Sequence, residues 1–266
     1  YPEYKELNTG MALAEFKAIF WVEFIHRLWG RLIGVAFFVP FSYFFIRGWI
    51  DGRDLPKFLF MAVLGSLQGV LGWYMVKSGL VDNPDVSPYR LTAHLGLAIF
   101  IYGYILWVAL GLLRLPGRKR RVGGAFVLVI LIFVTIISGG FMAGSSAGFG
   151  YNTFPTMDGE WLPDGLYALQ PFYSNFVLDI ATVQFNHRVL ATCIVVLVIA
   201  YWIWVRAAGM VARLRFSANL LVVGALAQAS LGVVTLLLVV PVPLALLHQA
   251  GAVALLSLAI WNAVEF

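Results

Sequence analysis

The chain has 266 residues, of which 61% are hydrophobic and 12% charged, and its mean hydropathy is +0.88. Soluble domains carry about 25% charged residues, so this composition excludes an ordinary soluble domain and indicates a membrane protein. The net charge of +5 comes from basic residues in short loops between apolar stretches, which argues against nucleic-acid binding. The single cysteine, Cys193, lies inside an apolar run and excludes an internal disulfide and a cysteine-based zinc site.

Seven stretches are apolar over about 20 residues, the length that a transmembrane helix needs. Each is too long and too continuously apolar for the alternating strands of a membrane barrel. The sequence therefore predicts an all-α polytopic membrane protein with seven transmembrane helices. The stretches are approximately 22–46, 57–77, 91–113, 123–145, 184–205, 217–240 and 244–264.

Basic residues occur in alternate loops, which predicts that these loops face the cytoplasm or the mitochondrial matrix. The other loops, including the long segment 147–183, are acidic or neutral and are predicted to face the opposite side. The two sets alternate without conflict along all seven spans. The basic residues are Arg47, Arg53 and Lys57 in the first such loop, Arg114, Arg118, Lys119, Arg120 and Arg121 in the second, and Arg206, Arg213 and Arg215 in the third.

The only four histidines are predicted to lie at one membrane level. Each falls within about two turns of the outward end of its predicted span, at 1.5 Å rise per residue. One histidine in a helix is usually a hydrogen-bonded packing residue, but four at one level favour a function, because ionisable side chains are costly in hydrocarbon. They are His26, His94, His187 and His248.

The sequence contains an apparent internal repeat. The segments "VEFIHRLWGR" at 22–31 and "VQFNHRVLAT" at 183–192 share Phe-x-His-Arg, and "LQGVLGWYMV" resembles "AQASLGVVTL". His94 then matches His248, so we predict a tandem duplication whose symmetry axis lies along the membrane normal.

The repeat predicts two halves, 1–115 and 116–266, each built on a four-helix bundle. The second half has four predicted helices and the first has three. We therefore expect an eight-helix fold whose first helix is absent from this chain. Residues 1–20 would then connect that helix to the one carrying His26, with their apolar residues at the membrane interface.

Each half supplies one histidine from its second helix and one from its fourth: His26 with His94, and His187 with His248. Two imidazoles facing each other across a helical bundle suit the two axial positions of a haem iron. Zinc or copper is less suited, because few further ligands are available in each half. Glycines would give a flat macrocycle room, although close helix packing would also explain them. They are Gly69, Gly72, Gly96, Gly232 and Gly251.

Cations near the outward rim would bind haem propionates. Arg27 and Arg90, with Arg31 and Lys77, are candidates in the first half, and Arg188 is the candidate in the second. The alternative is that these side chains simply extend to the membrane interface.

Glu23 breaks the symmetry between the halves. It lies one turn before His26 on the same helical face, whereas its counterpart Gln184 cannot ionise. The half with the carboxylate is therefore predicted to be the reactive one. The alternative is a solvated glutamate near the start of its helix, favoured by the helix dipole.

Several spaced segments together resemble the haem A synthase family, and the resemblance extends along nearly the whole chain. This family oxidises the ring position 8 methyl of haem O, through a hydroxymethyl stage, to the formyl group of haem A for cytochrome oxidase. The resemblance implies eight helices in two halves, of the proteobacterial and mitochondrial type that lacks a cysteine pair in an outward loop. The segments are "EFIHRLWGRLIG", "LQGVLGWYMVKSGL", "SPYRLTAHLGLA", "GFGYNTFPTMDGEW", "QFNHRVLA" and "PVPLALLHQAGAVALL".

The resemblance also implies residue roles. His26 and His94 would flank the site of substrate haem O and product haem A, His187 and His248 would ligate a b-type haem, and Glu23 would be the carboxylate important to activity. It implies a bacterial plasma membrane or mitochondrial inner membrane, with the histidines near the periplasmic or intermembrane-space side. Expected partners are membrane lipid, haem O synthase, cytochrome oxidase assembly factors, an electron donor and a second copy of the chain.

Two other functions remain open from the residues. A di-haem b-type electron carrier would hold two identical haems, with Glu23 accepting protons from a quinol. A transporter would also suit an internal repeat, but transporters place their polar groups near the midplane of the membrane, and these histidines are predicted to be peripheral.

Overall fold

The computed structural model describes residues 10–82, 87–113 and 123–266, without the side chains of 78–82. Within these ranges the seven predicted spans are confirmed as seven helices long and apolar enough to cross a membrane, and no strand is present. The protein is an all-α polytopic membrane protein. The helices are α2 (Leu13–Ile46), α3 (Leu55–Asp82), α4 (Pro88–Leu112), α5 (Gly124–Gly144), α6 (Ile180–Ala207), α7 (Ala212–Leu237) and α8 (Val242–Glu265).

Six of the seven described helices begin before their predicted apolar stretches, and in two of them a polar side chain caps the start. In α2 the carboxylate of Glu15 accepts the backbone N–H of Ala12 at 3.0 Å, and residues 13–21 contain no glycine or proline. From Leu13 onward the predicted connection is therefore continuous with the helix that carries His26, and its position at the membrane interface stays a prediction. In α6 the Asp179 carboxylate accepts the N–H of Ala181 at 3.1 Å, and Ile180 becomes the first helical residue.

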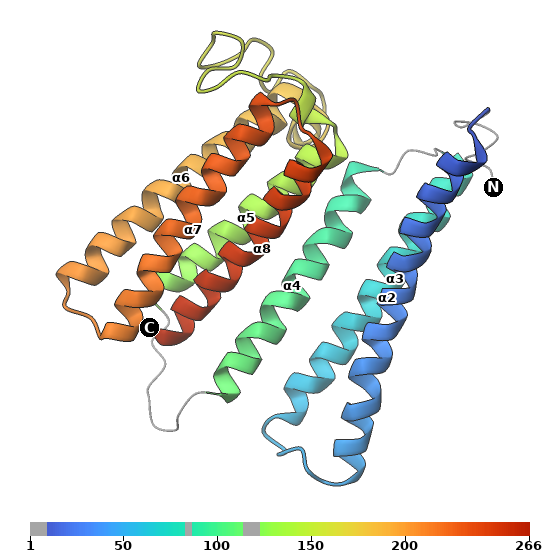
Figure 1. Ribbon diagram of the computed structural model, residues 1–266, viewed down its shortest axis with the longest axis vertical. Helices are drawn as coiled ribbons and strands as arrows, with labels where there is room; N and C mark the ends of the chain where they lie inside the picture. The colour runs from blue at the N-terminus through green and yellow to red at the C-terminus, as the bar shows by residue number, and fades with distance from the viewer. Residues whose placement is uncertain (1–9, 83–86, 114–122) are drawn as a thin grey trace. The chain divides into compact units, whose positions relative to one another are not determined.

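The described chain forms two compact units, Tyr1–Arg90 and Leu91–Phe266. In the first, α2 and α3 form an antiparallel hairpin (Figure 1). Gly48, with φ +69°, ends α2 and lets the chain reverse. No residue of α2 is buried within this unit, so its phenylalanine and tryptophan side chains leave an apolar face that the hairpin itself does not cover.

In the second unit, α5, α6, α7 and α8 form a four-helix bundle (Figure 1). Each helix packs against the next and α5 closes the ring against α8, so α6 and α8 are diagonal partners. Fully buried apolar side chains, among them Val198, Leu221 and Leu256, fill the interior. Away from the loop end, Tyr201 donates to Asn262 at 2.7 Å, and Asn262 donates to Ser217 at 2.7 Å. This buried polar chain joins α6, α8 and α7.

From Leu91 onward, α4 packs against the outside of α5. A Cβ atom on Gly140 of α5 would lie 3.1 Å from Cγ2 of Thr92 and 3.2 Å from Cδ2 of Leu95. The side chains of Thr92 and Leu95 therefore pack against α5 at a position that has no side chain.

The segment between α5 and α6 folds over the end of the bundle at which α6 and α8 begin (Figure 1). It contains two short 3₁₀ helices, Ala147–Phe149 and Phe172–Phe176. Asn175 is fully buried and bonds both the N–H and the carbonyl of Leu169. Asn152 donates to the carbonyl of Leu236 at 3.0 Å, which ties this segment to α7.

The predicted boundary between residues 115 and 116, and the basic residues at 114 and 118–121, lie outside the described residues. The two compact units divide at Arg90 and Leu91, near the start of α4. The tandem repeat and its two half-bundles stay predictions.

Candidate functional site

His187 and His248 lie in the same four-helix bundle, on the diagonal helices α6 and α8. Each comes about two turns after its helix begins, so both lie at the end covered by the loop. Both imidazoles are half-buried and close enough to interact electrostatically. The structure thus brings together the second predicted pair.

The hydroxyl of Ser138 on α5 determines the tautomer of His187. Ser138 Oγ lies 2.7 Å from His187 Nδ1 and 2.8 Å from the carbonyl oxygen of Thr135. Because a carbonyl only accepts, the hydroxyl proton goes to Thr135, and Ser138 Oγ accepts the proton on Nδ1. Nε2 is left with its lone pair, the form in which histidine ligates a metal.

Gln228 of α7 holds His248. Its Nε2 donates to the carbonyl of His248 at 2.8 Å and lies 3.1 Å from Nδ1 of the same residue, while its Oε1 is buried with no hydrogen-bond partner among the described residues. Whether the nitrogen or the oxygen of the Gln228 side-chain amide faces His248 Nδ1 determines the tautomer of His248. The NH₂ end favours a proton on Nε2, and the oxygen end would accept from Nδ1 and free Nε2 for a metal.

A glycine of a neighbouring helix lies against each imidazole. A Cβ atom on Gly139 of α5 would lie 3.4 Å from Cε1 of His187, and one on Gly232 of α7 would lie 2.8 Å from Cε1 of His248. Gly232 is therefore correctly predicted to adjoin the site. By contrast, Gly251 packs against Gln228, and a Cβ on Gly96 would lie 2.6 Å from Ile137, which is helix packing.

Arg188, predicted to bind a propionate, contacts the loop over the bundle. Its guanidinium donates to the carbonyl of Thr156 at 3.1 Å and to that of Tyr151 at 2.9 Å, while Nε is buried without a partner among the described residues. The fully buried Gln184 donates to the same Tyr151 carbonyl at 3.0 Å. Arg188 and Gln184 together join the loop to α6.

Glu23 and Arg27 form an ion pair one turn apart on α2, and about half of each side chain is exposed. Because α2 begins at Leu13, Glu23 is well inside the helix, and the alternative of a glutamate at the helix start is wrong. Arg90 lies over the ring of Tyr74, at 5.6 Å from its centre.

His26 lies about one turn beyond Glu23 on α2, in the first unit, whereas His94 lies about two turns into α4, in the second. Their pairing stays a prediction. The other three histidines each lie about two turns after the start of their helix. His26 lies further into its helix, because α2 begins earlier than predicted.

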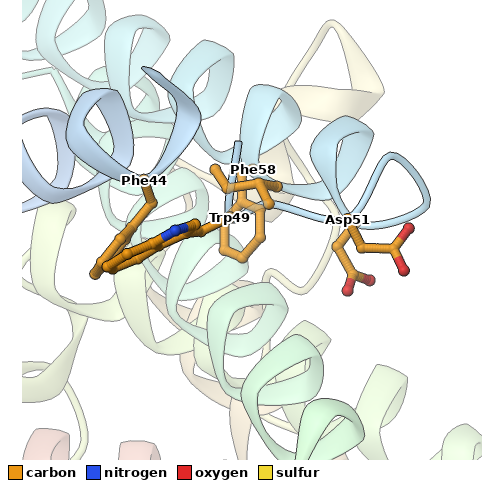
Figure 2. Close-up of a pocket in the computed structure, with 6 residues that line it drawn as sticks. Phe44, Trp49, Asp51 and Phe58 are labelled. Atoms are coloured by element: carbon orange, nitrogen blue, oxygen red, sulfur yellow. The ribbon is translucent and has the colours of Figure 1, made fainter. Parts of the chain in front are cut away.

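A separate pocket of about 370 Å³ lies at the turn between α2 and α3 (Figure 2). Its carboxylates are paired, Asp51 with Arg53 at 3.2 Å and Asp54 with Lys57 at 2.6 Å. Aromatic and charged side chains together are typical of a membrane interface. The pocket is at the opposite end of α2 from His26 and is not part of the histidine site. It is lined by Phe44, Trp49, Ile50, Asp51, Asp54 and Phe58.

The donor set in the bundle fits haem. In the part of the chain that the structure describes, no three His, Cys, Asp or Glu side chains gather to ligate a metal together. A haem iron takes two axial protein ligands and needs no such group. Two imidazoles on diagonal helices, with small residues beside them, supply this arrangement.

The fold and site define a multi-pass helical membrane protein with a bis-histidine four-helix bundle. Residues 1–260 match the cytochrome oxidase assembly protein family (COX15-CtaA), and the chain belongs to this family. It is similar to the haem A synthase of Nitrosospira multiformis, with 49% identity over 268 residues that cover 98% of this chain and 75% of the relative. It is 46% identical to the haem A synthase of Parvibaculum lavamentivorans, covering 98% of this chain and 76% of that one. The haem A synthase COX15 of Bos taurus is 42% identical, over 98% of this chain and 66% of its own length. The resemblance to haem A synthases is confirmed.

Proposed function

We propose that this protein is a haem A synthase, which oxidises the ring position 8 methyl of haem O to a hydroxymethyl and then to a formyl group for cytochrome oxidase. Its family and its relatives support this reaction. The structural observation that carries the proposal is the pair His187 and His248 on diagonal helices of one bundle.

The bundle of the second unit would hold a b-type haem through His187 and His248. Ser138 leaves Nε2 of His187 free to ligate, and the absence of side chains on Gly139 and Gly232 lets the two rings pack against neighbouring helices. Such a haem supplies one-electron oxidation and reduction. The protein residues orient the ligands and, with the covering loop, limit the access of water.

The substrate haem would lie between His26 and His94, with Arg27 and Arg90 near its propionates. Glu23 would accept a proton beside the methyl group, and its ion pair with Arg27 holds the carboxylate one turn from His26. In the second unit Gln184 occupies the matching position in the repeat, and its amide holds the loop through Tyr151. This difference supports one reactive half and one electron-transfer half.

The protein would act in a bacterial plasma membrane or the mitochondrial inner membrane. The alternation of basic loops favours a histidine end that faces the periplasm or intermembrane space. Haem O synthase would supply the substrate, cytochrome oxidase assembly factors would receive haem A, and a separate donor or acceptor would exchange electrons. A second copy of the chain is a further possible partner.

The test is chromatographic identification of the haems extracted from purified wild type, His26→Ala and His187→Ala. Haem B together with haem O or A in the wild type, and selective loss of haem B in His187→Ala, would support a substrate half and a cofactor half. Two equivalents of haem B, even when haem O is supplied, would instead support the di-haem electron carrier.

Glu23→Gln tests the catalytic carboxylate, because glutamine is the residue that the second half already has. We expect both haems to stay bound and conversion of haem O to stop. Normal turnover in this variant would contradict the role of Glu23, and Glu15→Gln on the same helix is the matched control, since Glu15 caps the first turn of α2.

A further inference from the structure

We propose that Ser138 is a positioning residue that fixes the tautomer of His187 and raises its electron donation to iron. The inference rests on the proposed haem b site. It adds a residue that the histidine pattern does not reveal.

The direction of the Ser138 hydroxyl is set by its own helix. Its proton is taken by the carbonyl of Thr135 at 2.8 Å, in the turn before it, so the oxygen presents lone pairs to His187 Nδ1 at 2.7 Å. The Thr135 hydroxyl does not compete, because it donates to the carbonyl of Leu131 at 2.9 Å. Ser138 is thus held as an acceptor.

The next residue on α5 supports the same ring. Gly139 brings the helix backbone against Cε1 of His187, close enough that an added Cβ atom would lie at 3.4 Å. Ser138 at Nδ1 and Gly139 at Cε1 therefore restrict the tilt of the imidazole. Nε2, on the side of the ring away from Ser138, is left to ligate iron.

His248 is held differently. Its partner Gln228 uses one amide nitrogen for both the His248 carbonyl and Nδ1, and its Oε1 is buried without a partner among the described residues. For His248 to ligate iron through Nε2, Gln228 must present Oε1 rather than its amide nitrogen to Nδ1. On His187 the acceptor at Nδ1 is Ser138 Oγ, as its geometry already sets it. Such an acceptor makes the imidazole a more basic ligand, which favours the ferric over the ferrous state.

The experiment compares purified, haem-loaded wild type with Ser138→Ala, Ser138→Thr and Ser145→Ala. Threonine keeps the hydroxyl, and Ser145 is a control at the end of the same helix whose hydroxyl donates to the carbonyl of Phe141 at 2.7 Å. The readouts are haem B per protein, the low-spin spectrum of bis-histidine ligation and the midpoint potential from a redox titration.

Ser138→Ala should keep a low-spin haem and shift its midpoint potential in the positive direction. A tenfold change in the ferrous-to-ferric ratio, the size we expect, corresponds to about 59 mV for one electron. Ser138→Thr and Ser145→Ala should match the wild type. An unchanged potential in Ser138→Ala with haem retained would overturn the inference.

Ser138→Cys covers the case in which the alanine variant loses its haem. Sulfur is a weak acceptor of similar position, so this variant should shift the potential in the same direction. A cysteine variant with the wild-type potential would then overturn the inference. Absence of low-spin haem B from the wild type would instead reject the proposed function, so the two failures are distinguishable.

Discussion

Gly232 of α7 lies directly against the imidazole of His248 on α8. A Cβ atom at position 232 would be 2.8 Å from Cε1 of the ring and 3.5 Å from both ring nitrogens. The first of these distances is too short for ordinary contact, so a methyl group there must displace the ring. The position of this imidazole therefore depends on the absence of a side chain on the neighbouring helix.

Gly232→Ala should sharply lower the haem B content while the helical fold is retained, since alanine favours a helix over glycine by about 1 kcal/mol. Haem per protein and far-UV circular dichroism measure the two effects. Gly139→Ala should lose less haem, because its added Cβ would lie 3.4 Å from Cε1 of His187. A Gly232→Ala protein with full haem content would contradict this account of the site.

Arg188→Gln should loosen the loop over the bundle. The variant loses the two hydrogen bonds that the guanidinium makes to Tyr151 and Thr156. Loss of one such charged bond costs about 1.5–3 kcal/mol, which increases local opening more than tenfold. Limited proteolysis measures the opening, and cleavage within the loop should be faster.

The same variant separates two roles of Arg188. If its main partner is a haem propionate, Arg188→Gln should lose haem B without faster loop cleavage. If the loop contact dominates, cleavage should increase first. Arg206→Gln is a control, because Arg206 bonds Asn219 at the far end of α6.

Tyr201→Phe should destabilise the bundle, because the buried Asn262 loses the hydroxyl that donates to its side-chain oxygen at 2.7 Å. An unpartnered buried acceptor costs about 1–3 kcal/mol. Denaturant unfolding in detergent measures the loss. Tyr173→Phe, at an exposed loop tyrosine, should leave stability unchanged.

The turn between α2 and α3 should lose stability in acid. The backbone N–H of Arg53, and then its guanidinium, hold the pKa of Asp51 below its usual 3.8. A carboxylate whose pKa is lowered in the folded state stabilises the fold fully at pH values above its unfolded-state pKa of 3.8. This stabilisation is lost as the pH falls through the lowered, folded-state pKa. The Tm of Asp51→Asn should therefore depend less on pH in acid than that of the wild type. Equal pH dependence would contradict the contribution of Asp51.

The seven helices could be predicted from the sequence because a span of about 20 apolar residues leaves few other structures. The pairing of His187 with His248 also followed, since both occur about two turns into helices that start on the same side. The contacts of Ser138 and Gln228 could not be predicted, because helices that are apolar all round give no signal of which face points inward. The sequence does contain one signal for Gln228, because it aligns with Gln68 in the two repeated segments.

The hydrogen bonds of Arg188 to the loop carbonyls also could not be predicted from the sequence. An arginine beside a histidine suggests an anionic ligand, but backbone carbonyls of an irregular loop leave no residue pattern. The start of α2 at Leu13 does not follow from apolar length alone, because helix propensity in residues 13–21 and the Glu15 cap extend the helix beyond the apolar stretch.

Two consecutive glycines on α5 face different helices. Gly139 adjoins His187 of α6, and Gly140 adjoins Thr92 on α4, the helix that carries His94. At these two positions α5 has no side chain between the helices, although Ile137 of the same turn contacts Gly96 of α4. The helix of one predicted haem ligand and the ring of another therefore pack against opposite sides of one turn of α5.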